Sequence, residues 1–128
     1  MKLLLDTHAL LWMVSSSDRL SSSAREAIAV EANELYFSIA GYWELGIKQS
    51  LGKLELASDW EDTLPREITR NRIVWLPIEP KHVQEVAALP WIHRDPFDRL
   101  MVAQARVEGL SIISRDQSLT EYDIRVLW

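Results

Sequence analysis

The 128-residue chain contains no cysteine, and this absence excludes three kinds of chemistry. Disulfide bridges, zinc–thiolate sites and thiol nucleophiles all require cysteine, and a chain without it fits a reducing cytoplasm, where we expect the protein to reside. Proline and glycine are also scarce, and no Pro/Gly/Ser-rich linker divides the chain. We therefore expect a single domain over residues 1–128, because this length suits one hydrophobic core and is short for two.

Long hydrophobic runs are missing as well. The apolar segment Leu3–Leu5 is interrupted by Asp6 and His8. It is therefore too short to span a bilayer and differs from the core of a signal peptide. We expect no association with a membrane.

Basic residues are fewer than acidic ones, 14 against 19, and the net charge is −5. This balance argues against a polyanionic partner such as RNA, because phosphate contacts depend on Lys and Arg. The argument weakens if several acids bind a metal ion, since the occupied site then becomes electropositive. Basic side chains remain for phosphate contacts in that case: Lys48, Lys53, Arg66, Arg70, Arg72, Arg99 and Arg115.

The hydrophobic pattern alternates between strands and helices. Apolar runs predict strands at 3–5, 35–37, 73–76, 110–113 and 124–127. Helical spacing predicts helices over 7–14, from 21 or 22 to 32, from 39 to about 51, within 60–70, after Pro80, and over 96–108. Gly52 and Gly109 are placed to end two of them. This alternation is typical of an α/β fold with a mainly parallel sheet covered by helices.

Four acidic residues stand beside apolar runs, spread over almost the whole chain. We call them the carboxylate quartet: Asp6, Glu44, Asp98 and Asp116. Asp6 and Asp116 follow strands that would end at the same edge of a parallel sheet, where ligands of such folds bind. Carboxylates brought together repel one another and are costly to desolvate, so a divalent metal ion is the simplest compensation.

Each member of the quartet also has a purely structural interpretation. Asp6 can cap the helix over 7–14, and Asp116 can belong to a turn or cap a short helix. Asp95 fits the cap of the helix beginning at Pro96, which leaves Asp98 in the first turn, where helix polarity favours an anion. Function is the stronger interpretation for Asp98, whereas the structural one slightly leads for Asp116.

Glu44 lies near an expected apolar stripe of its helix, so we expect it to be half-buried. Its alternative role is an ion pair with Lys48, four residues on. The stripe consists of Ala40, Trp43, Ile47 and Leu51.

Histidines and tryptophans fit structural roles better than a metal or base-stacking site. His8, His82 and His93 have no partner at the spacing of zinc ligands. Trp12 and Trp43 fall in expected helices with apolar neighbours, which favours packing. The other four tryptophans can include a surface that faces a partner: Trp60, Trp75, Trp91 and Trp128.

Four motifs in order resemble those of PIN-domain ribonucleases, specifically the VapC-type toxins of toxin–antitoxin pairs. They are residues 3–12 (LLLDTHALLW), 43–48 (WELGIK) with 51–54 (LGKL), 93–100 (HRDPFDRL) with 103–105 (AQA), and 114–116 (SRD). The resemblance implies a three-layer α/β/α domain in which the quartet holds Mg²⁺ or Mn²⁺, with Thr7 as an accessory group. It further implies endonucleolytic cleavage of RNA such as transfer RNA, a small antitoxin partner and a homodimer.

Two positions depart from the family pattern. The family commonly has Ser or Thr where this chain has Gly41, and Thr where it has Ser114. The first change removes a hydroxyl that can orient water or metal, and the second keeps one. The positive charge of Arg115 beside Asp116 can also weaken that carboxylate as a metal ligand.

Two other functions fit parts of the sequence. Asp6 after an apolar strand resembles a phosphate-accepting aspartate. However, His8 occupies the place of the second Asp of haloacid-dehalogenase-like phosphatases, and no Lys follows the late strand as in a receiver domain. The second possibility is a non-catalytic binding module of the same fold, which Gly41 and Arg115 suggest.

Overall fold

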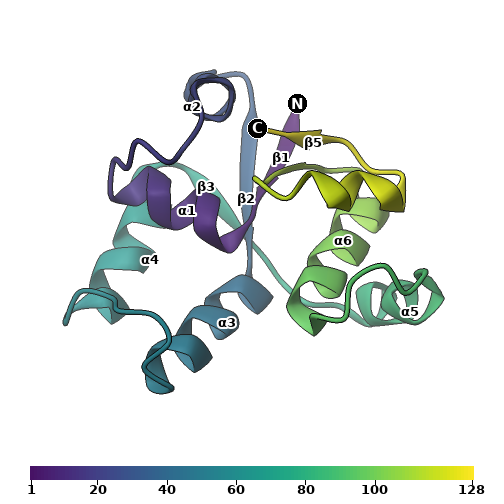
Figure 1. Cartoon of the computed structure of the whole chain (residues 1–128). Coiled ribbons are helices and arrows are strands. Elements are labelled where there is room, and N and C mark those ends of the chain that lie inside the picture. Colours follow the sequence, from purple (N-terminus) through teal and green to yellow (C-terminus); the bar gives the residue numbers. More distant parts are fainter.

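A parallel five-stranded sheet forms the centre of the protein, as the computed structural model of residues 1–128 shows (Figure 1). The strands are β1 (Lys2–Leu5), β2 (Glu34–Ser38), β3 (Ile73–Leu76), β4 (Ser111–Ile113) and β5 (Val126–Leu127). Their order is β3-β2-β1-β4-β5, and every neighbouring pair is parallel. All five strands therefore end at the same edge of the sheet, with β1 in the middle. The prediction of a mainly parallel α/β fold is confirmed.

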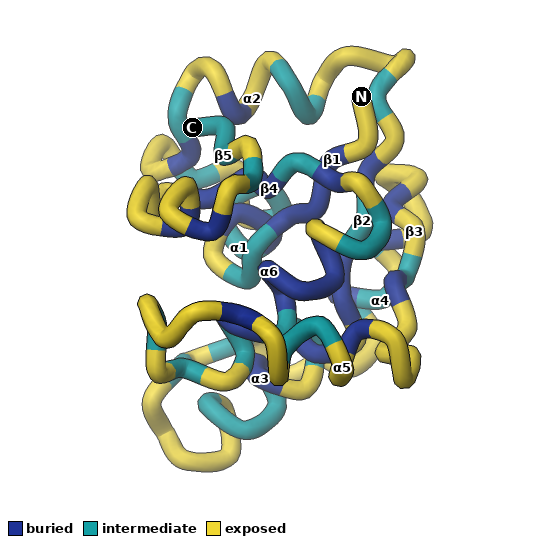
Figure 2. Tube along the Cα trace, turned by 90° about the vertical axis from the view of Figure 1, so that its right-hand side faces the viewer, coloured by how far each residue is buried: buried dark blue, intermediate teal, exposed yellow.

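Helices cover both faces of the sheet, which gives three layers (Figure 1). Leu3 and Leu5 belong to the core on one face, together with residues of α1 (Thr7–Val14), α2 (Ser22–Ala29), α3 (Ile39–Ser50) and α4 (Trp60–Arg70). Leu4 points to the opposite core, which α5 (Pro80–Ala88), α6 (Pro96–Glu108) and the 3₁₀ helix η1 (Gln117–Tyr122) cover. Figure 2 shows that buried stretches, most of β1 among them, lie at the centre of the molecule and that exposed residues surround them. None of the helices has the length and apolar character needed to cross a bilayer.

The helix α2 ends at Ala29, three residues before the predicted end at Ala32. Asn33 explains the early end, because its side-chain amide donates to the Ala27 carbonyl at 2.8 Å. Its side-chain oxygen accepts from the N-terminal amine of Met1 at 3.0 Å. The chain is thereby turned directly into β2, and residues 30–33 leave the helix.

The predicted apolar stripe of α3 was right for Ala40 and Ile47, which are buried and half-buried, and wrong for its other two members. Trp43 and Leu51 are 59% and 62% exposed, whereas the helix buries Ala40, Glu44 and Leu45. The helix α3 contacts both α1 and α6, and its position between these two helices decides which face is buried. Glu44 is consequently buried deeper than the hydrophobic pattern indicates.

Arg99 closes the end of α5 and is unavailable for the phosphate contacts that the sequence suggested. Its side chain is buried and donates to the carbonyls of Pro90 at 2.8 Å and Val86 at 3.0 Å. The Trp91 ring covers the guanidinium at 3.9 Å from the ring centroid. Carbonyls at a helix end lack partners within the helix, so this one cation satisfies groups that would otherwise be buried without hydrogen bonds.

Replacing Arg99 by Met should therefore lower the free energy of unfolding by about 2–4 kcal/mol, because the carbonyls lose charged donors. Urea denaturation measures this change. The exposed Arg70 gives a matched control, and Arg70→Met should change stability by less than about 0.5 kcal/mol. Equal stability of the two variants would contradict the assigned role of Arg99.

Candidate active site

The carboxylate quartet lines one cleft of about 600 Å³ at the carboxyl edge of the sheet. Asp6 follows β1, Asp116 lies beyond β4, and Glu44 and Asp98 project from α3 and α6. Thr7 and Ser114 line the same cleft. The structure thus brings together residues that are up to 110 positions apart, because parallel strands deliver their ends to one edge.

Asp6 serves both roles that the sequence left open. Its Oδ1 atom accepts from the Ala9 amide at 2.7 Å, so it caps α1 while it faces the cleft. Burial raises the pKa of Asp6, and the Glu44 charge adds to that effect. The neighbouring Ser114 hydroxyl and the Ala9 amide oppose the increase in pKa.

Glu44 is held through both of its carboxylate oxygens. Thr7 Oγ1 donates to Glu44 Oε1 at 2.7 Å, and Lys48 Nζ lies 3.1 Å from Oε2. The ion pair with Lys48 is therefore present, although Glu44 is only 7% exposed and lines the cleft as well. Lys48 remains partly accessible to solvent.

Asp98 carries the most perturbed carboxyl of the cleft. Burial is the main reason that the pKa of Asp98 rises from 3.8 to about 6, and the negative charges of Asp95 and Glu44 raise it further. Asp95 is the helix cap, as predicted, because its Oδ1 accepts from the Phe97 amide at 2.8 Å. With the cap supplied by Asp95, the Asp98 carboxyl is left facing the cleft.

Asp116 caps η1 and faces the cleft. Its Oδ1 accepts from the Ser118 amide at 3.0 Å, and its Oδ2 lies 3.0 Å from His93 Nε2. Burial alone would raise the pKa of Asp116, but hydrogen bonds from Ser118 and His93 outweigh burial and lower it. The sequence analysis assigned His93 a structural role, and its contact with Asp116 could not be predicted because the two residues are 23 positions apart.

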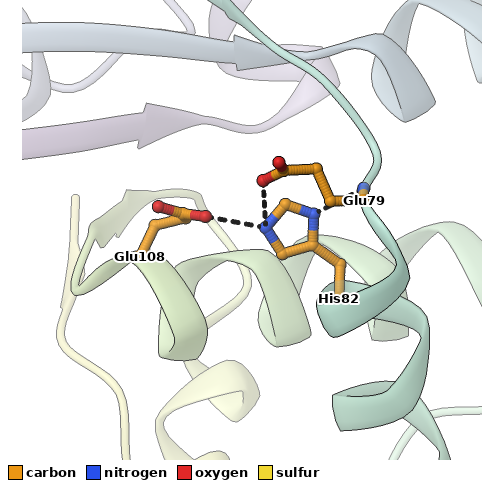
Figure 3. Close-up of side chains that lie close together, drawn as sticks. All are labelled: Glu79, His82 and Glu108. Atoms are coloured by element: carbon orange, nitrogen blue, oxygen red, sulfur yellow. Dashed lines mark hydrogen bonds and ion pairs between the residues drawn. The ribbon is translucent and has the colours of Figure 1, made fainter.

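The spacing of the quartet differs from that of a compact metal cluster. Ligand atoms of three His or acidic residues come within 4.8 Å of one another only at Glu79, His82 and Glu108 (Figure 3). No three members of the quartet therefore bring their carboxylate oxygens within 4.8 Å of one another.

The cluster in Figure 3 is a hydrogen-bonded junction between α5 and α6. The Glu79 amide donates to His82 Nδ1 at 3.0 Å, so the neutral ring carries its proton on Nε2, which lies 2.9 Å from Glu108. Lys81 Nζ forms an ion pair with the Glu108 carboxylate at 2.9 Å. Both ring nitrogens and the carboxylate already have partners, so this cluster is structural.

The presence of glycine at position 41 has a steric reason that the sequence did not reveal. A Cβ atom at this position would lie 2.9 Å from Phe37 Cζ and 3.4 Å from Thr7 Oγ1. Phe37 is buried, and its ring would have to shift before any side chain could occupy position 41. The Phe37 ring therefore excludes the Ser or Thr side chain that the family commonly has at position 41. The Thr7 hydroxyl lies beside the space that this side chain would occupy.

The family follows from comparison with known proteins. The model of the PIN-domain family matches residues 3–125, and the chain belongs to this family. The resemblance to VapC-type proteins that the motifs indicated is confirmed by a relative: the chain is 30% identical over 120 residues to Ribonuclease VapC22 of Mycobacterium tuberculosis. This alignment covers 93% of this chain and 90% of the relative.

Solved structures share the fold. The structure of VapBC2 from Rickettsia felis, bound to a DNA fragment from the promoter, matches with a TM-score of 0.75 at 12% identity. The match covers 98% of this chain and 97% of that one. A toxin–antitoxin complex from Klebsiella pneumoniae matches with a TM-score of 0.57 at 18% identity, over 94% and 88% of the two chains.

Replacing Gly41 by Ser should destabilise the protein by about 1–3 kcal/mol, because the added Cβ overlaps the Phe37 ring. Adding Phe37→Leu should remove the overlap, so the double variant should be more stable than the sum of the two single costs predicts. Thermal unfolding of the four proteins completes the cycle. Strictly additive costs would contradict the steric explanation.

Replacing Asp98 by Asn should stabilise the metal-free protein at neutral pH. The folded pKa lies above the unfolded value, so the folded state binds the extra proton and wild-type stability falls as the pH rises from about 4 through about 6. Partial exposure of Asp98 screens the effect. We therefore expect the free energy of unfolding of Asp98→Asn to exceed that of the wild type by about 1–2 kcal/mol near pH ~8, and by almost nothing near pH ~4. Urea denaturation in EDTA measures it; a gain independent of pH would contradict the assignment.

Proposed function

We propose that this protein is a metal-dependent endoribonuclease and the toxin of a toxin–antitoxin pair. The observation that carries the proposal is the gathering of the carboxylate quartet in one cleft, where burial and like charges raise the pKa of Asp98 to about 6. Such a cleft attracts a cation, because each carboxylate is more stable beside positive charge. Its relative VapC22 carries the name ribonuclease, which supports the proposed reaction.

The donors of the cleft suit Mg²⁺ or Mn²⁺. The quartet offers carboxylate oxygens, and the hydroxyls of Thr7 and Ser114 lie beside them. Hard divalent cations prefer oxygen ligands, and Mg²⁺ usually retains part of its water, which suits a cleft in which no three quartet residues bring their oxygens within 4.8 Å of one another. We assign the quartet as the residues that would hold the ion, with Thr7 and Ser114 as accessory groups.

When bound, the ion would activate water for attack on phosphorus and offset the charge of the phosphodiester. The chain itself orients the site: Thr7 and Lys48 fix the two oxygens of Glu44. Lys48 and Arg115 also line the cleft, where they can neutralise phosphates on either side of the scissile bond. The positive charges of Lys48 and Arg115 allow RNA to bind at the cleft although the net charge of the chain is negative.

The partners that we propose follow from the same family. A small antitoxin would silence the nuclease by placing its tail over the cleft, with an Arg among the carboxylates. The Klebsiella pneumoniae structure is a toxin–antitoxin complex by its title, which supports such a partner. We further propose a homodimer, a cytoplasmic location and structured RNA such as transfer RNA as the substrate.

Purified protein should cut transfer RNA or total RNA into discrete fragments in Mg²⁺ or Mn²⁺ and leave it intact in EDTA. Asp98→Asn should lower the rate by at least about 100-fold, because a neutral amide replaces a charged ligand. The variant should remain folded, as urea denaturation would show. Gel electrophoresis of labelled RNA measures the cleavage rate.

An identically purified Asp59→Asn protein is the matched control, because Asp59 lies in an exposed segment before α4 and outside the cleft. It should cleave like the wild type. Equal cleavage by wild type and Asp98→Asn would indicate a contaminating nuclease. If neither metal supports cleavage, a non-catalytic binding module becomes the better interpretation of the fold.

A further inference from the structure

A hydrogen-bonded chain runs from the protein interior to one member of the quartet. Tyr122 is buried, and its ring stacks on that of His93 at a centroid distance of 5.3 Å. The imidazole in turn lies against Asp116 and Ser118 at the cleft. His93 does not itself line the cleft, so the direction of its hydrogen bonds shows how it acts on Asp116, which does.

Tyr122 determines which nitrogen of His93 carries the proton. The tyrosine oxygen accepts from the backbone amide of His93 at 2.7 Å and lies 3.0 Å from His93 Nδ1. The backbone amide can only donate, and the buried hydroxyl of Tyr122 has no hydrogen-bond acceptor other than Nδ1. A buried hydroxyl proton needs an acceptor, so the hydroxyl donates to Nδ1 and the neutral imidazole carries its own proton on Nε2.

The protonated Nε2 is directed at Asp116. It lies 3.0 Å from Asp116 Oδ2 and 2.9 Å from Ser118 Oγ. Ser118 donates to Asp116 Oδ1 through both its amide and its hydroxyl. A nitrogen that carries a proton has no lone pair for a metal ion, so His93 acts here as a donor to the carboxylate.

We propose that His93 is a positioning residue, which holds the Asp116 carboxylate for cation binding and whose tautomer Tyr122 fixes. This inference rests on the proposed function. Each carboxylate oxygen has two lone pairs. Ser118 uses both lone pairs of Oδ1 and His93 uses one of Oδ2, which leaves one lone pair on Oδ2 for an ion.

Positioning matters for this acid more than for its neighbours. The Asp116 side chain is 45% exposed and begins a short 3₁₀ helix, whereas Glu44 is buried and held by two partners. Ser118 already holds Oδ1, and His93 is the hydrogen-bond partner of Oδ2. A ligand oxygen that is mobile must lose that freedom when a cation binds. His93 removes part of this cost beforehand, and partners of this kind typically change metal affinity by about 10–100-fold when mutated.

Two substitutions of His93 distinguish the role of its Nε2 hydrogen-bond donor from that of the imidazole ring. The side-chain nitrogen of Gln can occupy the place of histidine Nε2, whereas that of Asn reaches only the place of Nδ1. We therefore expect His93→Asn to weaken Mn²⁺ binding by about 10-fold or more, and His93→Gln to retain most of the affinity. Titration calorimetry with Mn²⁺ alone, without RNA, measures both against the wild type.

The ring itself gives a second readout that does not need metal. The ¹⁵N NMR spectrum of the wild-type imidazole should show a protonated Nε2 and an unprotonated Nδ1 for His93. Tyr122→Phe keeps the ring packing and removes the hydroxyl, so the second tautomer should appear. A wild-type ring protonated on Nδ1 would overturn the proposal, because Nε2 would then be free to act as a ligand.

The outcomes distinguish this inference from the proposed function. Wild-type affinity in His93→Asn, or an equal loss in the Asn and Gln variants, would overturn the positioning role while cation binding by the wild type stands. If the wild type itself fails to bind Mn²⁺, the proposed metal-dependent function fails and this inference fails with it. Weak Mn²⁺ binding by His93→Asn together with near wild-type binding by His93→Gln supports both the proposed function and the positioning role of His93.

Discussion

Everything in this protein depends on a buried parallel sheet whose strands all end at one edge. Leu3, Leu4 and Leu5 of the central strand are almost completely inaccessible to water, so β1 must be covered on both faces. That requirement places helices on either side and forces each connection to return over the sheet before the next strand begins. As a result, Asp6 and Asp116, separated by most of the chain, reach the same cleft.

The price of this arrangement is electrostatic. Glu44 lies almost entirely out of solvent, and Asp98 stands close enough to Asp95 and Glu44 for their charges to raise its pKa. The fold offsets the repulsion locally: the Ala9 amide binds Asp6, and Thr7 with Lys48 binds Glu44. Asp98 receives no such donor, and its carboxyl therefore marks the point where a cation would stabilise the cleft most.

Other polar side chains have structural roles. Arg99 closes α5 and the buried His82 joins α5 to α6. Ser38, at the margin of the cleft, links the end of β2 to Gln104 through a hydrogen bond of 2.6 Å. No buried side-chain nitrogen or oxygen lacks a partner. The perturbed carboxyls of Asp6 and Asp98 are thus concentrated where the sheet ends, as expected of functional sites in general.

The sequence by itself determined the elements and their order. Periodicity and the caps at Asp95 and Gly109 predicted α6 to the residue, because these signals are local and act over one helical turn. It also predicted that Asp6 and Asp116 would follow strand ends, and that Glu44 and Asp98 would lie on helices. The motifs identified the family for the same reason, since each motif is a short, continuous stretch of the chain.

Only the tertiary structure decided which faces and partners those residues have. The burial of Glu44 and the exposure of Trp43 follow from packing of α3 between α1 and α6, which helical periodicity cannot report. The steric need for Gly41 depends on the Phe37 ring, and the role of His93 depends on Tyr122 and Asp116, all brought close by folding. Such contacts join distant segments, so no local pattern in the sequence encodes them.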